Sequence, residues 1–343
     1  ALEGHEAYFT ASDGAKIFTR RWEPTSGQPV RAAIHLHHGL GEHCLRYAEL
    51  AARLVQENFV VLSHDARGHG QTAEIEGSLG LGRVAAGPEG AVPRMVADLA
   101  EMLCAEQAER PDVPFFIFGH SFGTVISQLC LGAGAGGARV AGLVLSAPPA
   151  RVPNVALPAL KLVMATLHGV HGEHGISSIP SKLSFEKFQA KCLAAVKHDG
   201  VPTGWEWLNR DKAEVEKYIK DPYCGFDSSV GFWTSAVGAF QRIKTPDAHA
   251  GTPPNLPTLI LAGEHDFCLF DDFGVPSYER IRAELASWGK ATPKVIVYPG
   301  ARHELMKELN RAEVMEDMVR FLCACDGRQA YITRTNAGRS VCC

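Results

Sequence analysis

The fold is decided by one stretch of the sequence, Pro114-Phe115-Phe116-Ile117-Phe118-Gly119-His120-Ser121-Phe122-Gly123. Its first half is apolar and uncharged, which predicts a central strand covered on both faces. Residues 122–131 predict a helix that begins directly behind the serine. A strand that reverses into a helix within one residue strains the backbone there, and the flanking glycines remove Cβ atoms that would collide. This setting predicts a sharp turn that presents the Ser121 hydroxyl as a nucleophile.

A serine hydroxyl is a poor nucleophile unless a base and an orienting acid accompany it. Another buried strand is predicted at residues 258–263 and the next strand at 294–298, and Asp266 and His303 follow them. If the strands are parallel, the three side chains lie at the carboxyl edge of the sheet, where open α/β sheets place their sites. His303 would then remove the Ser121 proton, and Asp266 would hold the imidazole in the correct tautomer.

Asp271 and Asp272 are alternative acids for this triad. Both lie farther beyond the strand end than Asp266, behind the apolar residues 267–270. Because the acid of such a triad should follow its strand closely, Asp266 is the preferred assignment.

The tetrahedral intermediate of acyl transfer needs two amide donors. The first candidate is the backbone N–H of Phe122, directly after the serine. The second is the backbone N–H of Leu40, in the loop His38-Gly39-Leu40-Gly41 that follows a predicted strand at 32–37. Taken alone, His38-Gly39 is typical of an ordinary glycine turn. Beside a complete triad it predicts an oxyanion loop.

Five motifs follow one another along the chain: His38-Gly39-Leu40-Gly41-Glu42-His43, Asp65-Ala66-Arg67-Gly68-His69-Gly70, Gly119-His120-Ser121-Phe122-Gly123, Gly263 with Asp266, and Gly300-Ala301-Arg302-His303-Glu304-Leu305. In this order they resemble the monoacylglycerol lipase and bacterial lysophospholipase branch of the α/β-hydrolase superfamily, over roughly residues 6–325. The resemblance implies an α/β fold with a mostly parallel eight-stranded sheet, helices on both faces and an inserted helical cap.

The resemblance also bears on the substrate. It implies that Glu42 and Arg46 line the polar end of the site, where the lipase members hold a glycerol head group. The alternative is that Glu42 starts a helix and Arg46 is solvated. Animal monoacylglycerol lipases carry a second histidine three residues after the catalytic one, whereas this chain has Met306 there. This chain therefore departs from the family in the residues that recognise glycerol.

The domain organisation follows from where the strand pattern stops. An opening hairpin is predicted around residues 12–14, and strands then alternate with helices until residue 149. The pattern resumes only about a hundred residues later, which is too long for a loop. We therefore expect four parts: core residues 1–150, a helical cap at 151–252, core residues 253–327, and a flexible tail at 328–343.

The first cap segment, residues 153–170, is apolar except for Lys161. A helix that is apolar almost all round is usually buried, so burial is the favoured interpretation. Two alternatives remain open: part of this helix lines an acyl tunnel through Leu160, Met164 and Leu167, or it touches a lipid surface transiently.

Composition excludes several classes of function. The 343 residues are 46% hydrophobic with a net charge of −4, which is typical of a globular enzyme and gives no basic surface for nucleic acid. No apolar run approaches the roughly 18 residues that span a bilayer, and the first residues are polar, so neither a transmembrane helix nor a signal peptide is expected. We therefore expect a cytoplasmic protein, with peripheral membrane contact through the cap as the alternative.

The ten cysteines are scattered, with no spacing typical of a metal site. We expect reduced, mostly structural cysteines and neither a metal nor a cofactor. The terminal Cys342 and Cys343 follow no C-a-a-X motif. A frayed end is favoured for them over acylation or double prenylation.

Together these features predict a capped serine hydrolase that transfers an acyl group from Ser121 to water. The expected substrate is a single-chain lipid ester, either a monoacylglycerol or a lysophospholipid. A general carboxylesterase, a protein depalmitoylating thioesterase and a peptidase are alternatives with the same chemistry. A catalytically silent relative that binds an acyl ligand or a partner is the alternative from another class. The sequence predicts no oligomeric state.

Overall fold

The computed structural model describes residues 4–25, 27–84, 89–197, 200–271 and 273–326. The predicted tail at 328–343, with Cys342 and Cys343, and the alternative acid Asp272 lie outside the described residues. None of the helices in the described part of the chain is long and apolar enough to cross a membrane.

One sheet of eight strands forms the centre of the molecule, in the order β1-β2-β4-β3-β5-β6-β7-β8. The strands are β1 His5–Thr10, β2 Lys16–Trp22, β3 Ala32–His37, β4 Phe59–His64, β5 Phe115–His120, β6 Val140–Ser146, β7 Thr258–Gly263 and β8 Lys294–Tyr298. Strand β2 pairs antiparallel with β1 on one side and with β4 on the other. All other strand pairs are parallel. The predicted fold class is confirmed.

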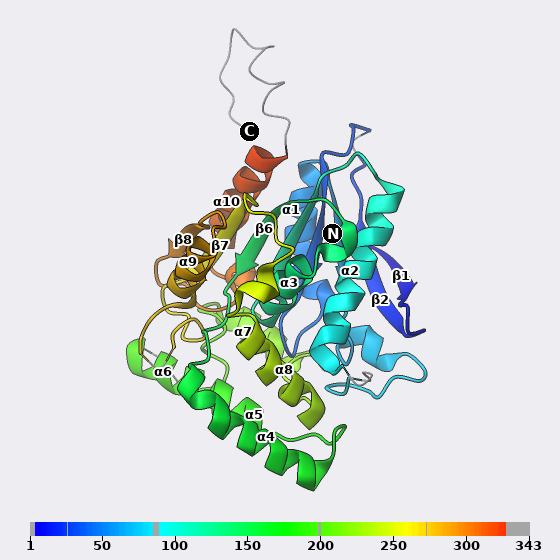
Figure 1. The fold of residues 1–343 in the computed structure, drawn as a ribbon. Helices are drawn as coiled ribbons and strands as arrows, with labels where there is room; N and C mark the ends of the chain where they lie inside the picture. Colours follow the sequence, from blue (N-terminus) through cyan, green and yellow to red (C-terminus); the bar gives the residue numbers. More distant parts are fainter. Residues whose placement is uncertain (1–3, 26, 85–88, 198–199, 272, 327–343) are drawn as a thin grey trace.

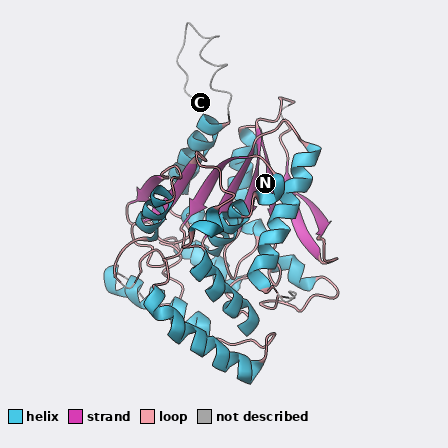
Figure 2. Ribbon diagram, viewed as in Figure 1, coloured by secondary structure: helices cyan, strands magenta, loops and turns pink. Residues whose placement is uncertain are grey.

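Helices cover both faces of this sheet (Figure 2). The helices of the core are α1 Ala48–Gln56, α2 Ala91–Glu109, α3 Phe122–Gly132, α9 Ser277–Ser287 and α10 Arg311–Cys325. Phe115 and Ile117 of β5 pack into the core shared with α2 and α3, whereas Phe116 and Phe118 pack into the core shared with α1 and α10. Successive side chains of a strand point to opposite faces, so an apolar run without alternation fills both cores.

The predicted interruption between β6 and β7 is helical. It contains α4 Leu157–His171, α5 Ile179–Ser181, α6 Lys187–Ala195, α7 Lys212–Lys220 and α8 Val230–Arg242, which lie together at one end of the sheet (Figure 1). The single-turn helices are η1 Cys44–Tyr47, η2 Gly70–Glu74, η3 Ala135–Gly137, η4 Asn154–Ala156, η5 Lys182–Glu186, η6 Pro246–His249 and η7 Leu305–Lys307. The division into core, cap and tail stays a prediction.

Helix α4 corrects the favoured interpretation of the apolar cap segment. Only one stripe, Leu157, Met164 and Leu167, is buried, and it packs into the core that contains α8. Val155, Leu162 and Val170 are 80%, 69% and 72% exposed. The helix lies at the outer edge of the molecule (Figure 1). It is therefore largely exposed although most of its residues are apolar. Burial of the whole helix was therefore the wrong interpretation.

Candidate active site

Ser121 occupies the sharp turn between β5 and α3. Its backbone has φ 50° and ψ −121°, a region that residues with a side chain rarely adopt. The turn leaves no room for larger neighbours, because a Cβ on Gly123 would lie 2.4 Å from the carbonyl oxygen of His37. A Cβ on Gly119 would lie 2.6 Å from the carbonyl oxygen of Gly123. The local sequence therefore produces the strained turn, and close packing of β3 and α3 holds it.

Asp266 and His303 form a buried pair at the same edge of the sheet. Asp266 follows β7 and His303 follows β8, and Asp266 Oδ2 lies 2.9 Å from His303 Nδ1. The two residues are 0% and 3% exposed, and Asp266 Oδ1 accepts a hydrogen bond from the Cys268 backbone N–H. Burial lowers the pKa of His303, but the charge and hydrogen bond of Asp266 outweigh it, so the pKa is raised overall.

Ser121 and His303 line the same small cavity, of about 40 Å³. The cavity is also lined by Gly39, Leu40, Glu42, His120, Phe185, Trp207, Leu208, Tyr218, Cys268 and Glu304. The His303 ring contacts the rings of Trp207 and His120, with centroids 5.1 and 4.9 Å away. The aromatic wall from the cap was not predicted, because nothing local in the sequence says which tryptophan of the insert turns toward the serine.

The loop after β3 is held by its own side chains. His38 Nδ1 lies 2.6 Å from the Gly39 carbonyl oxygen, and His38 Nε2 accepts a hydrogen bond of 2.9 Å from the Ala66 N–H. The second bond requires the proton to sit on Nδ1, which therefore donates to Gly39. In a trans peptide the C=O and N–H point in opposite directions, so this bond also sets the direction of the Leu40 N–H. Sequence analysis missed this role of His38, because Ala66 belongs to a different loop.

The predicted amide donors belong to Leu40 and Phe122. Leu40 lines the cavity beside Ser121, and Phe122 is the first residue of α3. Within the described residues, neither backbone N–H has a recorded hydrogen-bond acceptor. Two amides free to donate beside a strained serine are what a developing oxyanion requires.

Glu42 and Arg46 form a buried charged network instead of facing solvent. Arg46 contacts Glu42 Oε2 at 2.7 Å and both carboxylate oxygens of Glu304, at 2.5 and 2.8 Å. Glu42 Oε1 accepts hydrogen bonds from Gly39 N–H and from the Tyr47 hydroxyl. Glu42 lines the cavity of Ser121, whereas Arg46 lies behind it, over the Tyr218 ring. The alternative of a solvated Arg46 is wrong, because its side chain is 11% exposed and pairs with two carboxylates. Glu42 does not start a helix either, since η1 begins at Cys44 with His43 as its N-cap.

The remaining predicted site residues lie elsewhere. Met164 and Leu167 are buried in the main core and Leu160 packs against it, and none of the three lines the cavity of Ser121. The sequence could not show which surface this apolar stripe contacts. The same spacing of apolar residues suits a helix that lines a tunnel and a helix that packs on α8. Asp271 accepts hydrogen bonds from Arg280 and from two backbone amides of its own turn. In this structure it is Asp266 that contacts His303.

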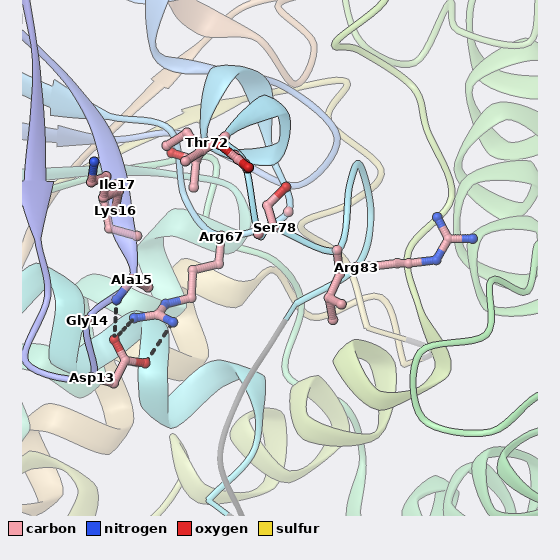
Figure 3. Close-up of a pocket in the computed structure, with 14 residues that line it drawn as sticks. Asp13, Gly14, Ala15, Lys16, Ile17, Arg67, Thr72, Ser78 and Arg83 are labelled. Carbon is pink, nitrogen blue, oxygen red and sulfur yellow. Dashed lines mark hydrogen bonds and ion pairs between the residues drawn. The ribbon is translucent and has the colours of Figure 1, made fainter.

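A larger cavity, of about 660 Å³, lies away from the serine, between the β1–β2 turn and the loop after β4 (Figure 3). Its central cation, Arg67, pairs with Asp13 at 2.8 Å and with Asp98 at 2.7 Å. Arg83 points away from Arg67 (Figure 3). Two carboxylates thus neutralise Arg67, and none of Ser121, Asp266 and His303 is among the described residues that line this cavity.

Comparison with known proteins places the chain among hydrolases. The family model described as serine aminopeptidase, S33, matches residues 28–310. Human monoglyceride lipase is 32% identical over 301 residues, which cover 87% of this chain and 83% of the human protein. A carboxyl esterase from Bacillus coagulans, solved in complex with glycerol, superposes with a TM-score of 0.79 at 24% identity and covers 95% of this chain and 100% of its own. A soluble variant of the Saccharomyces cerevisiae monoglyceride lipase superposes with a TM-score of 0.68 at 20% identity, over 94% and 96% of the two chains. The resemblance inferred from the motifs is confirmed.

Proposed function

The chain belongs to the serine aminopeptidase S33 family of α/β-hydrolases, and from this premise we propose that it hydrolyses single-chain lipid esters through an acyl-enzyme on Ser121. One observation carries the proposal: a serine in a strained turn shares its cavity with a buried histidine that is paired to a carboxylate. At the coarser level, the family and its monoglyceride lipase relatives support an ester-hydrolysing enzyme.

The reaction proceeds in two acyl transfers. His303 takes the proton of Ser121 as the Oγ attacks the ester carbonyl, and Asp266 stabilises the imidazolium that forms. The amides of Leu40 and Phe122 donate to the oxyanion of the tetrahedral intermediate. His303 then gives its proton to the leaving alcohol, and the acyl group stays on Ser121. In the second half, His303 activates a water molecule that releases the fatty acid and restores the serine.

The polar end of the site favours an uncharged head group. The carboxylate of Glu42 lines the cavity, whereas the guanidinium of Arg46 is already paired with Glu42 and Glu304. A phosphate would need an unpaired cation, and a glycerol needs only hydrogen-bond partners. We therefore assign Glu42, supported by Arg46, to the glycerol hydroxyls and expect monoacylglycerol to be preferred over lysophospholipid.

The apolar end lies under the cap. Phe185, Trp207 and Leu208 line the cavity of Ser121, and Phe185 also lines a second cavity of about 440 Å³ between α5, α6 and the residues around Trp205 and Phe226. We propose that an acyl chain attached to Ser121 passes Phe185 into this second cavity, because Phe185 lines both. This assignment replaces Leu160, Met164 and Leu167, whose stripe faces the core. The small size of the first cavity favours a second candidate, a carboxylesterase for short acyl chains.

Chain-length dependence separates the two candidates. For a lipid esterase, kcat/KM should rise about fourfold per added CH₂ from acetate upward until the cavity is filled, because each buried CH₂ contributes about 0.8 kcal/mol. Phe185→Ala should flatten this rise and spare acetate esters. The measurement is steady-state hydrolysis of p-nitrophenyl esters from acetate to palmitate, extended to monoacylglycerols and lysophosphatidylcholine.

The matched control is Phe188→Ala. Phe188 packs on Trp207, with ring centroids 5.5 Å apart, but lines neither cavity. The same flattening in both variants would indicate lost packing instead of a lost acyl contact. A preference for acetate esters in the wild type would support the carboxylesterase, turnover of aminoacyl amides the peptidase, and turnover of palmitoyl thioesters the thioesterase.

The exposed apolar face of the cap supports a further part of the proposal, transient contact with a lipid surface. Leu162 and Val170 of α4 and Leu183 of η5 are 69%, 72% and 60% exposed. Exposed apolar side chains on these two helical segments would lower the free energy of the protein when they enter the apolar layer of a membrane surface. Leu162→Ser with Val170→Ser should reduce co-sedimentation with phosphatidylcholine vesicles several-fold without changing hydrolysis of a water-soluble short ester. Equal sedimentation of variant and wild type would contradict this contact.

A further inference from the structure

Among the residues that the structure describes, one group of metal-ligating side chains lies outside the Ser121 site and has no assigned role. His43 lies in the loop after β3, and Asp221 and Cys224 lie in the turn after α7. We propose that these three residues bind a divalent zinc ion, which fastens the turn after α7 to the loop that carries Leu40.

The geometry of the group suits zinc. His43 Nε2 and Asp221 Oδ2 are 2.9 Å apart, and the His nitrogen, the carboxylate oxygen and the Cys224 Sγ all lie within 4.8 Å of one another. A tetrahedral zinc ion with bonds of about 2.0–2.3 Å holds its ligand atoms roughly 3–4 Å apart. Small side-chain rotations therefore suffice to bring the three atoms around one ion. Imidazole, carboxylate and thiolate are the three ligand types that zinc accepts in proteins.

The turn that carries two of the ligands is already shaped for the task. The Tyr223 N–H donates to Asp221 Oδ1 at 2.9 Å, and the Cys224 N–H donates to the Asp221 carbonyl oxygen at 3.0 Å. These bonds fix the carboxylate and leave Oδ2 directed at His43. Such hydrogen bonds to a ligating carboxylate orient it and strengthen metal sites. His43 is 8% exposed, whereas Asp221 and Cys224 are half-buried, so solvent can supply the fourth ligand.

The surrounding charges favour a cation. Arg46 acts electrostatically on both Asp221 and Cys224, and it is bound by the carboxylates of Glu42 and Glu304. Its positive charge is thus already more than compensated before Asp221 is counted. Together with Asp221, the carboxylates that a divalent ion at His43 would approach outnumber the one guanidinium of Arg46.

An ion at this position would link the turn after α7 to the loop after β3. The Gly225 N–H and the Tyr218 hydroxyl both donate to the Gly41 carbonyl oxygen at 3.0 Å, so the turn after α7 already rests on the loop after β3. A zinc ion would add a second, stronger link between the same two segments. Because the folded protein alone assembles the three ligands, the ion should stabilise the native state. Sequence analysis missed the group because His43 and Asp221 are 178 residues apart.

Among the described residues, a second group has ligand atoms at similar spacing, namely Asp266, Cys268 and His303. This group belongs to the Ser121 site. An ion there would occupy the imidazole that the reaction needs, so the experiment must distinguish the two positions.

The test uses the full chain, stripped of metal with a chelator and dialysed. Zn²⁺ is titrated by calorimetry, and Co²⁺ is added separately to detect the absorption of a cobalt–thiolate bond. We expect one equivalent of Zn²⁺, a rise in the Tm, and a cobalt–thiolate band. Cys224→Ser should abolish the band and weaken Zn²⁺ binding at least about 100-fold, and Asp221→Asn should weaken it about 10-fold or more.

Two control variants separate this site from other thiols. Cys268→Ser and the double replacement Cys342→Ser with Cys343→Ser should keep both the band and the wild-type affinity. Retention of fluorophosphonate labelling by Cys224→Ser would show that this variant is folded. Wild-type Zn²⁺ affinity in folded Cys224→Ser overturns the proposal. So does loss of the cobalt band in Cys268→Ser alone, or the lack of any such band in the wild type.

Discussion

Ser121→Ala should remove labelling by a fluorophosphonate and lower the kcat for ester hydrolysis by about 10⁴–10⁶-fold. Labelling requires a nucleophilic Oγ, and without that atom no acyl-enzyme forms. The residual rate comes from the oxyanion donors and substrate positioning alone, which is why triad deletions leave some catalysis above water. His303→Ala should have about the same effect, and the double variant should be no slower, because the two residues act as a unit.

The matched control for this substitution is Ser127→Ala. Ser127 is a buried serine of α3, the helix that follows Ser121, and its hydroxyl donates to the Gly123 carbonyl oxygen at 2.8 Å. Loss of this hydroxyl should lower the free energy of unfolding by about 1 kcal/mol and leave fluorophosphonate labelling intact. Near-full activity of Ser121→Ala on a short p-nitrophenyl ester would show that the mechanism is wrong. A wild-type protein that neither labels nor hydrolyses any ester would favour the catalytically silent alternative.

Asp266→Asn should lower kcat by about 10⁴-fold, because the amide favours the wrong tautomer of His303 while keeping the shape of the site. The substitution also changes the pH dependence. Asp266 raises the pKa of His303, and the reaction needs the neutral imidazole, so the wild-type rate increases as the pH rises through that pKa. With the carboxylate gone, the pKa should fall and the rising limb of the kcat/KM profile should move to lower pH.

Asp271→Asn is the matched control for this experiment, with Asp272→Asn beside it. Asp271 holds its own turn and pairs with Arg280 at 2.9 Å, so its loss should affect the turn and leave the pH profile in place. A large loss of kcat confined to position 271 or 272 would overturn the assignment of the acid. An unchanged pH profile in Asp266→Asn would show that His303 is not the base.

Part of the fold could be predicted from local patterns alone. The apolar runs 114–118 and 258–263 became β5 and β7 because a run without alternation is stable only where both faces are buried. The same logic failed for α4, where composition suggested burial and the structure exposes Leu162 and Val170. A high apolar content indicates that burial of a helix would stabilise the protein. Which side of the helix is buried depends on the elements that pack against it.

Local sequence patterns were enough to locate the groups on which the proposed chemistry depends: a serine in a strand–helix turn, an acid and a histidine behind later strands, and a glycine loop behind an early one. These are local signals, since each rests on a few consecutive residues and the parallel order of the strands. The surroundings of these groups depend on contacts that form only when the chain folds. The salt bridges of Arg46 to Glu304, the bond from Ala66 to His38, and the approach of His43 to Asp221 join segments far apart along the chain. No local pattern encodes such contacts, because they depend on how the cap and the sheet pack together.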